Sequence, residues 1–154
     1  MCIRDSPNAD HSLSGSDALE TVLAFYVSVL NDIPRPQFSW EFHGDGSIAV
    51  SSETSVEEVK LWSAVNPLAR DFRKETIGDS WKAVSLDILE SGIYKAKTDE
   101  PPVGWKAYFV ELTYSTPFGI PLKFTTPVRV LPDTLPFEYK PPKNPKKGFL
   151  SKNK

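Results

Sequence analysis

The sequence contains very little cysteine and histidine. It has one cysteine, Cys2, and two histidines, His11 and His43, in 154 residues. A single cysteine excludes an internal disulfide and a cysteine-rich metal site, and two histidines are too few to suggest a structural zinc site. We therefore expect no metal and no other cofactor.

Long apolar runs are also absent. No stretch approaches the roughly 18 apolar residues that a membrane-spanning helix needs. Arg4, Asp5 and Ser6 interrupt any apolar core near the N-terminus, so no signal peptide is visible. Residues 1–6 (MCIRDS) resemble a translated sequencing adapter. We interpret them as an artefact or a non-native N-terminus, and we expect the chain to be cut from a longer gene.

A surplus of positive charge is missing as well, because the net charge is −2. Residues 140–154 contain six lysines and no acid, which leaves −8 for residues 1–139. An acidic body argues against nucleic acid as the main partner, since phosphate binding needs clustered lysine and arginine. The Lys- and Pro-rich tail has little to bury, so we expect it to be disordered. A role for this tail on nucleic acid or an anionic membrane remains the alternative.

Residues 17–33 show the period of an amphipathic helix. Their apolar residues recur at spacings of three and four on one stripe: Leu19, Val22, Leu23, Tyr26, Val29, Leu30 and Ile33. Asp17 and Glu20 have the spacing of a capping box at the helix start. The helix is expected to end by Ile33, because Pro34 disfavours helical geometry in the residue before it. The following segment, Pro34 to Pro36, predicts a stiff linker.

After residue 36 the apolar period changes to two, which is typical of half-buried strands. The expected strands are residues 37–42, 46–51, 57–64, 70–77, 80–89, 92–97, 105–115 and 121–131. Pro127 inside the last of these indicates a sheet edge or a bulge. We therefore expect a mainly β fold. One N-terminal amphipathic helix is followed by an antiparallel β-sandwich of the immunoglobulin or fibronectin-III type over residues 36–139, and then by the disordered tail, residues 140–154.

Four tryptophans, Trp40, Trp62, Trp81 and Trp105, could form a platform that stacks on sugars, but their surroundings favour core positions. Trp40 alternates with two phenylalanines, and Trp62 ends an apolar stretch, so these two are expected to point inward. In residues 105–115 the even- and odd-numbered side chains are expected to lie on opposite faces of a sheet.

The charged residues do not point to one particular kind of functional site. Arg70 and Arg73 lie in a mixed-charge stretch that is typical of a solvated face with weak ion pairs, with an anion site as the alternative. Asp45 with Asp79 or Asp87 could supply the two carboxylates of a glycoside hydrolase. The Asp-Gly turn explains Asp45 more simply.

His11 lies in a polar loop directly before the predicted helix. A loop histidine can act as general acid and base near neutral pH, but the local sequence alone is more typical of a solvated side chain. The chain contains no GxSxG elbow. If His11 is catalytic, its partners therefore lie outside this chain.

Five ordered blocks resemble the C-terminal portion of the PhoPQ-activated pathogenicity-related family. They are PNADHSLSGSDALETVLAFY, RPQFSWEF, EVKLWSAVNPLARDFRKETIG, GWKAYFVELTY and PLKFTTPVRVLPDTLPF, and together they cover roughly residues 7–139. Members of this family are similar to α/β-hydrolases with a C-terminal β-domain, and more distantly to serine peptidases of the prolyl-oligopeptidase type. Many members are exported.

This resemblance implies a specific role for His11. In the family, the histidine of the block matching PNADHSL aligns with the triad histidine, which takes a proton from the serine and returns it to the leaving group. Residues 7–33 would then be the last loop and helix of a hydrolase domain, since histidine comes last in the chain order Ser, Asp, His. The serine, the acid and the oxyanion hole would lie upstream, so we expect this chain to be inactive alone.

The resemblance thus predicts a C-terminal fragment of an exported serine hydrolase, periplasmic or extracellular, that acts on a peptide or ester. Its partner would be the missing upstream hydrolase domain, and without that domain the apolar stripe of the helix would favour self-association. The alternative is a stand-alone extracellular β-sandwich module that binds protein or carbohydrate. A GxSxG-like elbow in the upstream sequence would favour the hydrolase over the module.

Overall fold

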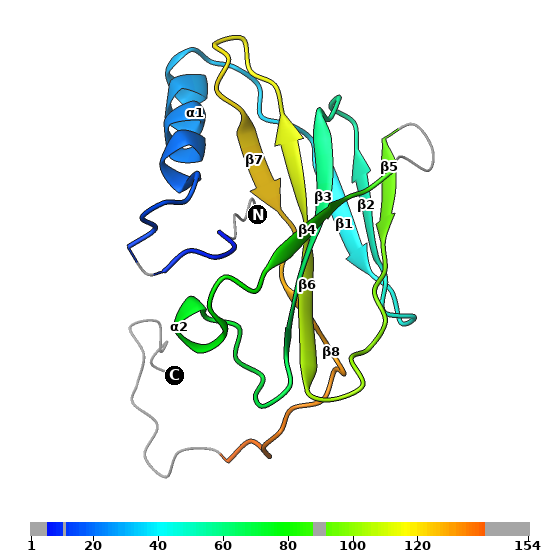
Figure 1. Ribbon diagram of the computed structural model, residues 1–154. Helices are drawn as coiled ribbons and strands as arrows, with labels where there is room; N and C mark the ends of the chain where they lie inside the picture. Colours follow the sequence, from blue (N-terminus) through cyan, green and yellow to red (C-terminus); the bar gives the residue numbers. More distant parts are fainter. Residues whose placement is uncertain (1–5, 11, 88–91, 141–154) are drawn as a thin grey trace, which may run out of the picture.

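The computed structural model describes residues 6–10, 12–87 and 92–140. In these residues the elements are α1 (Ala18–Leu30), β1 (Phe38–Phe42), β2 (Ile48–Ser52), β3 (Glu58–Asn66), α2 (Lys74–Ile77), β4 (Lys82–Ser85), β5 (Ile93–Ala96), β6 (Trp105–Tyr114), β7 (Leu122–Thr125) and β8 (Arg129–Leu131). The strands form two antiparallel sheets, which confirms the expected mainly β class (Figure 1).

The smaller sheet has the order β1-β2-β5, and the larger sheet has the order β4-β3-β6-β7. The short strand β8 also pairs with β6, at the end opposite to the part that pairs with β7. Pro127 lies between β7 and β8. Because proline has no backbone N–H for a sheet ladder, the expected single strand over residues 121–131 is interrupted there.

Seven of the eight expected segments contain strands, although residues 88 and 89 of one segment lie outside the described residues. The exception is residues 70–77, where the predicted strand is wrong and the chain forms a turn and α2. Asn66 Oδ1 accepts hydrogen bonds from the amides of the next two non-proline residues, and Asp71 Oδ1 accepts one from Arg73 N at 3.2 Å. Such side chains compete with a strand ladder for the backbone.

The two sheets share one apolar core. It is built from the buried residues Ala24, Ile48, Val50, Val59, Tyr94, Ala96, Tyr108, Val110, Leu112, Tyr114, Leu122, Phe124 and Leu131. The even-numbered residues of β6 from Tyr108 to Tyr114 belong to this core, as the alternation predicted. Phe38 of the smaller sheet contributes from the other side, with its ring centroid 5.6 Å from that of Phe124.

The opposite face of the larger sheet is covered as well. Phe109, Glu111 and Thr113 are buried there on β6. The ring of Trp81 packs on Phe109 at 5.3 Å between centroids, and Phe72 packs on Trp81 at 6.2 Å. The segment around α2 therefore forms a partial third layer on this face.

This extra layer explains why one predicted core position is wrong. The strand register places Leu61 opposite Val110, which faces the shared core, and places Trp62 opposite Phe109 on the other face. Trp62 therefore does not point between the sheets. Both faces of β3 are partly covered, so apolar residues occur at odd-numbered and at even-numbered positions. The alternation therefore does not show which side chains of β3 face the core between the sheets. Trp40 does pack against the shared core, as expected.

Helix α1 lies beside β7 (Figure 1). Its buried face consists of small residues: Ala18, Thr21, Ala24 and Ser28. The predicted apolar stripe lies largely outside this contact. Its exposed members and their exposed fractions are Leu19 79%, Val22 63%, Leu23 46%, Tyr26 58%, Val29 55% and Leu30 63%. The helix therefore packs on the sheet through small side chains and presents its large ones to solvent.

The helix start differs from the capping box that the sequence predicts. Asp17 precedes the first turn but makes no side-chain capping hydrogen bond. Its carboxylate pairs instead with Lys123 Nζ of β7 at 2.5 Å. The helix ends at Leu30, before Pro34, as expected.

Two further sequence expectations concern the chain ends. The segment interpreted as an artefact, apart from Ser6, and the tail beyond Lys140 lie outside the described residues. Of the two helices that the structure describes, neither is long and apolar enough to cross a membrane.

Candidate functional site

His11, the candidate triad histidine, lies outside the described residues. The loop on both sides of it is described. Asp10 Oδ1 accepts hydrogen bonds from the Ser12 amide at 2.8 Å and from Ser12 Oγ at 2.5 Å. Leu13 N donates to Asp10 O at 3.1 Å, and Ser16 N donates to Leu13 O at 3.2 Å. These bonds form a compact local loop that leads into α1.

The start of this loop is attached to the β portion of the chain, residues 38–131, by Asn8. Asn8 Nδ2 donates to the Trp81 carbonyl, and Asn8 Oδ1 accepts from the Trp81 amide, both at 3.0 Å. Lys74 Nζ donates to the Asn8 carbonyl at 3.0 Å and pairs with Asp79 Oδ1 at 3.2 Å. We call this set of contacts the Asn8 clamp. It joins residues that are 73 positions apart in the sequence.

Trp81, which Asn8 binds, is itself held against the larger sheet. The Trp81 ring packs on buried Phe109, and Trp81 Nε1 donates to the Phe72 carbonyl at 3.3 Å. Ser80 Oγ donates to the Ile77 carbonyl at the end of α2. Asn8 thus binds a backbone position that aromatic packing and hydrogen bonds fix in place.

An open hollow of about 480 Å³ lies between the loop and α2. It is lined by Ala9, Asp10, Arg73, Lys74 and Glu75. The Arg73 guanidinium already donates to both carboxylate oxygens of Asp71, at 2.9 and 2.6 Å. These bonds hold the pKa of Asp71 well below its usual range. Because Arg73 is paired in this way, the geometry argues against Arg73 as an anion ligand, and Arg70 does not line this hollow.

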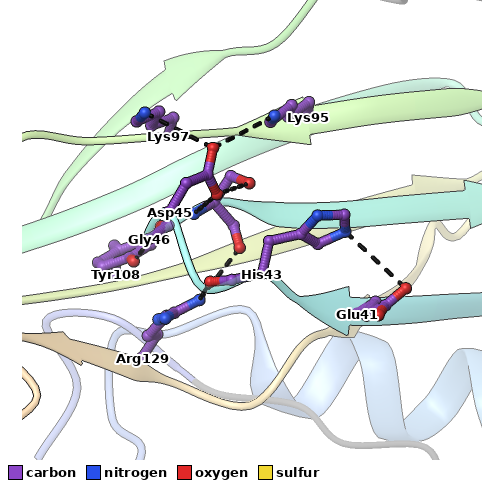
Figure 2. A network of polar contacts seen from close by, with 9 residues as sticks. Glu41, His43, Asp45, Gly46, Lys95, Lys97, Tyr108 and Arg129 are labelled. Carbon is purple, nitrogen blue, oxygen red and sulfur yellow. Dashed lines mark hydrogen bonds and ion pairs between the residues drawn. The ribbon is translucent and has the colours of Figure 1, made fainter.

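A second polar cluster surrounds the turn between β1 and β2 (Figure 2). Asp45 Oδ1 accepts from the amide and the hydroxyl of Ser47, at 3.0 and 2.6 Å, and Oδ2 lies 3.5 Å from Lys95 Nζ and 3.6 Å from Lys97 Nζ. The Ser47 bonds, with smaller contributions from the lysines, hold the pKa of Asp45 well below its usual range. Asp45 therefore stabilises the turn. Its carboxylate pairs with Lys95 and Lys97, whereas the carboxylate of Asp79 pairs with Lys74.

The same turn is fastened to the larger sheet. Tyr108 Oη donates to the Gly46 carbonyl at 2.5 Å, and the Arg129 guanidinium donates to the carbonyls of His43 and Ser47, at 2.7 and 3.1 Å (Figure 2). Burial raises the pKa of the Tyr108 hydroxyl. His43 Nε2 lies 3.8 Å from Glu41 Oε2. This cluster joins the two sheets and holds a hairpin rather than presenting groups to a substrate.

The tryptophans do not form one platform. Trp40 packs against the core between the sheets, whereas Trp81 packs on the opposite face of the larger sheet. Within the described ranges, no group of three or more His, Cys, Asp or Glu residues is arranged to hold a metal ion.

Sequence reasoning identified the loop around His11 but missed the Asn8 clamp. The only local signal was the Pro7-Asn8 turn, which also places Asn8 at a positive φ of 56°. Nothing in the sequence indicates that this asparagine binds Trp81, because the pairing depends on the tertiary fold.

Comparison with known proteins gives two matches. The family described as PhoPQ-activated pathogenicity-related protein matches residues 1–73, which include the loop, α1 and strands β1 to β3. The chain is also 32% identical over 160 residues to Autocrine proliferation repressor protein A of Dictyostelium discoideum. This alignment covers 88% of the chain and 32% of the relative, so the chain spans about a third of the relative's length. No solved structure matches the chain.

Proposed function

Because residues 1–73 match the PhoPQ-activated pathogenicity-related family, over about the N-terminal half of the region in which the sequence resembles it, we propose that this chain is the C-terminal part of a serine hydrolase. In this proposal His11 is the triad histidine, and the serine, the acid and the oxyanion hole lie in an upstream catalytic domain. The reaction is acyl transfer from a peptide or ester to water. The chain has no hydrolase activity by itself.

The observation that carries this proposal is the exposed side of α1. Six large apolar side chains of the helix are 46–79% exposed, while its small residues pack on β7. Fully burying one such side chain contributes roughly 1.5–3 kcal/mol, so an uncovered stripe forfeits a substantial stabilisation. Between Ala18 and Leu30 the only charged residue is Glu20, and a helix without lysine or arginine is poorly suited to an anionic membrane. The apolar sheet of an upstream hydrolase domain is a partner of the required chemistry.

In the proposed protein the β portion is an accessory domain of the immunoglobulin or fibronectin-III type. It packs against the catalytic domain and contributes to substrate access or partner binding. The whole protein is exported. These assignments rest on the family resemblance together with the two-sheet architecture.

The test is to recover the upstream coding sequence and express the whole protein. A fluorophosphonate probe should label one serine, and His11→Ala should lower turnover by several orders of magnitude, because triad members act as a unit. His43→Ala is the matched control, since His43 belongs to the hairpin cluster. Near-normal turnover in the His11 variant, or an upstream sequence without a nucleophile elbow, would refute the proposal. The 154-residue chain alone should show no labelling that depends on His11.

A second role is suggested by the name of the Dictyostelium relative, which describes an autocrine repressor of proliferation. A stand-alone extracellular binding module would fit that name without any hydrolase chemistry. A simple experiment distinguishes the hydrolase from the binding module. Saturable binding of the isolated chain to cells, together with an upstream sequence that lacks the elbow, would favour the module.

A further inference from the structure

We propose that the β portion positions the histidine loop through the Asn8 clamp, with Asn8 as a positioning residue; this inference rests on the proposed function. The clamp uses both polar atoms of the Asn8 amide, which bind the N–H and the C=O of Trp81. A side-chain amide that satisfies a backbone donor and acceptor together defines the orientation of both partners. Lys74 adds a third bond, to the Asn8 carbonyl.

The identity of residue 8 matters for its backbone as well as its side chain. Its φ of 56° lies in the left-handed region, which asparagine, aspartate and glycine adopt more readily than other residues. Of these three, only asparagine supplies a donor and an acceptor from the side chain. The position therefore requires a residue that fits the turn and also pairs with Trp81.

The other end of the loop is fixed to the same β portion. Asp17 pairs with Lys123 of β7, and the small face of α1 packs directly after it. Asn8 and Asp17, which flank the loop, are thus both bonded to residues far along the chain. Fixing the two flanks of a loop lowers the conformational entropy of the chain between them before any substrate binds.

This arrangement gives the β portion a part in catalysis. A general base must be held close to its productive geometry, and a misplacement of about 1 Å can cost on the order of 100-fold in rate. In the proposed hydrolase the serine lies on the upstream domain, whereas the histidine loop is anchored on the β portion. The relative position of the serine and the histidine then depends on the clamp.

The first experiment uses the 154-residue chain and amide hydrogen exchange. Asn8→Gly keeps the left-handed backbone accessible and removes the clamp, while Asn8→Asp keeps the acceptor for the Trp81 amide. We expect exchange at Trp81, Leu13 and Ser16 to accelerate at least tenfold in Asn8→Gly and to be partly restored in Asn8→Asp. Asn31→Gly is the matched control, because the Asn31 side chain donates to the Val27 carbonyl within α1 and, in the part of the chain that the structure describes, takes no part in the clamp. Unchanged exchange at these amides in Asn8→Gly would overturn the proposal.

The second experiment uses the whole protein with its upstream domain. Asn8→Gly should lower kcat by about 10- to 100-fold with little change in KM, and Asn8→Asp should recover part of the loss. Accelerated exchange with an unchanged kcat would overturn the positioning role of Asn8. A whole protein without any serine-hydrolase activity would instead refute the proposed function, and the exchange experiment would still show whether the clamp exists.

Discussion

At the residue scale, short polar side chains that bind the backbone near them shape several turns of this chain. Asp45, Asp71 and Asn66 each accept hydrogen bonds from amides two or three residues further along. Such bonds fix a turn locally and need no distant partner. For the two aspartates, a side-chain hydrogen bond, from the Ser47 hydroxyl to Asp45 and from the Arg73 guanidinium to Asp71, lowers the pKa of the carboxyl group most, and the amide bond lowers it further.

Asp45→Asn tests this electrostatic contribution. The pKa of Asp45 in the folded chain lies below its ordinary value of 3.8, so the charged turn adds stability above that value, and this stability is lost as the pH falls towards the folded pKa. We expect the unfolding free energy of the variant to decline less steeply than that of the wild type between about pH 5 and pH 2. Urea denaturation at several pH values measures this slope.

Glu100→Gln, a substitution in an exposed loop, is the control and should retain the wild-type slope. A decline in the Asp45 variant as steep as in the wild type would show that the turn contributes nothing through its charge.

Tyr108→Phe tests the bond that fastens the hairpin to the larger sheet. Tyr108 is fully buried, and its hydroxyl donates to the Gly46 carbonyl. Removing the hydroxyl leaves that carbonyl without this donor, which costs about 1–3 kcal/mol. Chemical denaturation should show this loss, whereas Tyr26→Phe on the exposed side of α1 should change stability by less than about 0.5 kcal/mol. Equal effects of the two variants would argue against the fastening role of Tyr108.

At the element scale, the spacing of apolar residues was enough to predict the type of most elements. The helix and seven of the eight strand segments were predicted in this way, although the apolar stripe of the helix lies on its exposed side and its buried face consists of small residues. The strand at residues 70–77 was not, because Asp71 and its neighbours use their side chains to form a turn instead. Trp62 was misplaced because the third layer covers the second face of the sheet. The clamp needs a contact over 73 residues, which no local pattern contains.

The exposed side of α1 leads to a prediction about association. Without a covering domain, the wild-type chain should self-associate at high concentration through its apolar helix side chains. Leu23→Asp together with Leu30→Asp should make it monomeric and leave the unfolding transition of the sheets in place, because both residues lie on the exposed side. Sedimentation velocity measures the first effect, and urea denaturation measures the second.

A charge-matched control replaces two exposed polar residues, Ser14 and Asn31, with aspartate and should leave self-association unchanged. Two results together would contradict the exposed position of the helix side chains. The wild-type chain would be monomeric at high concentration, and the sheets of the double leucine variant would be unfolded.

At the scale of the whole molecule, the sheets form the centre and the N-terminal residues form an outer attachment. The shared core contains residues from both sheets and Ala24 from α1. The Asn8 clamp and the pair of Asp17 with Lys123 add polar contacts on the outer face. The β portion therefore has a core of its own, and the helix adds stability to it from outside.

Residues 36–139 expressed alone should accordingly fold and unfold cooperatively. Their unfolding free energy should be lower than that of the full chain by about 2 kcal/mol or more, because the two Asn8 hydrogen bonds alone contribute about 1 kcal/mol each. Tryptophan fluorescence during urea denaturation can follow this, since Trp81 loses its clamp. A non-cooperative transition would contradict the independent core, and an unchanged stability would contradict the attachment.

The anchoring of the loop at both ends also decides where this polypeptide can be divided. The proline content of residues 34–36 suggests a domain boundary. A protease cut there, however, would place Asn8 and Asp17 on a different fragment from their partners Trp81 and Lys123. By physical contact, the N-terminal residues from Asn8 onward belong with the strands. Anyone who exchanges the β portion between related proteins should therefore place the crossover before Pro7, so that the histidine loop travels with the surface that holds it.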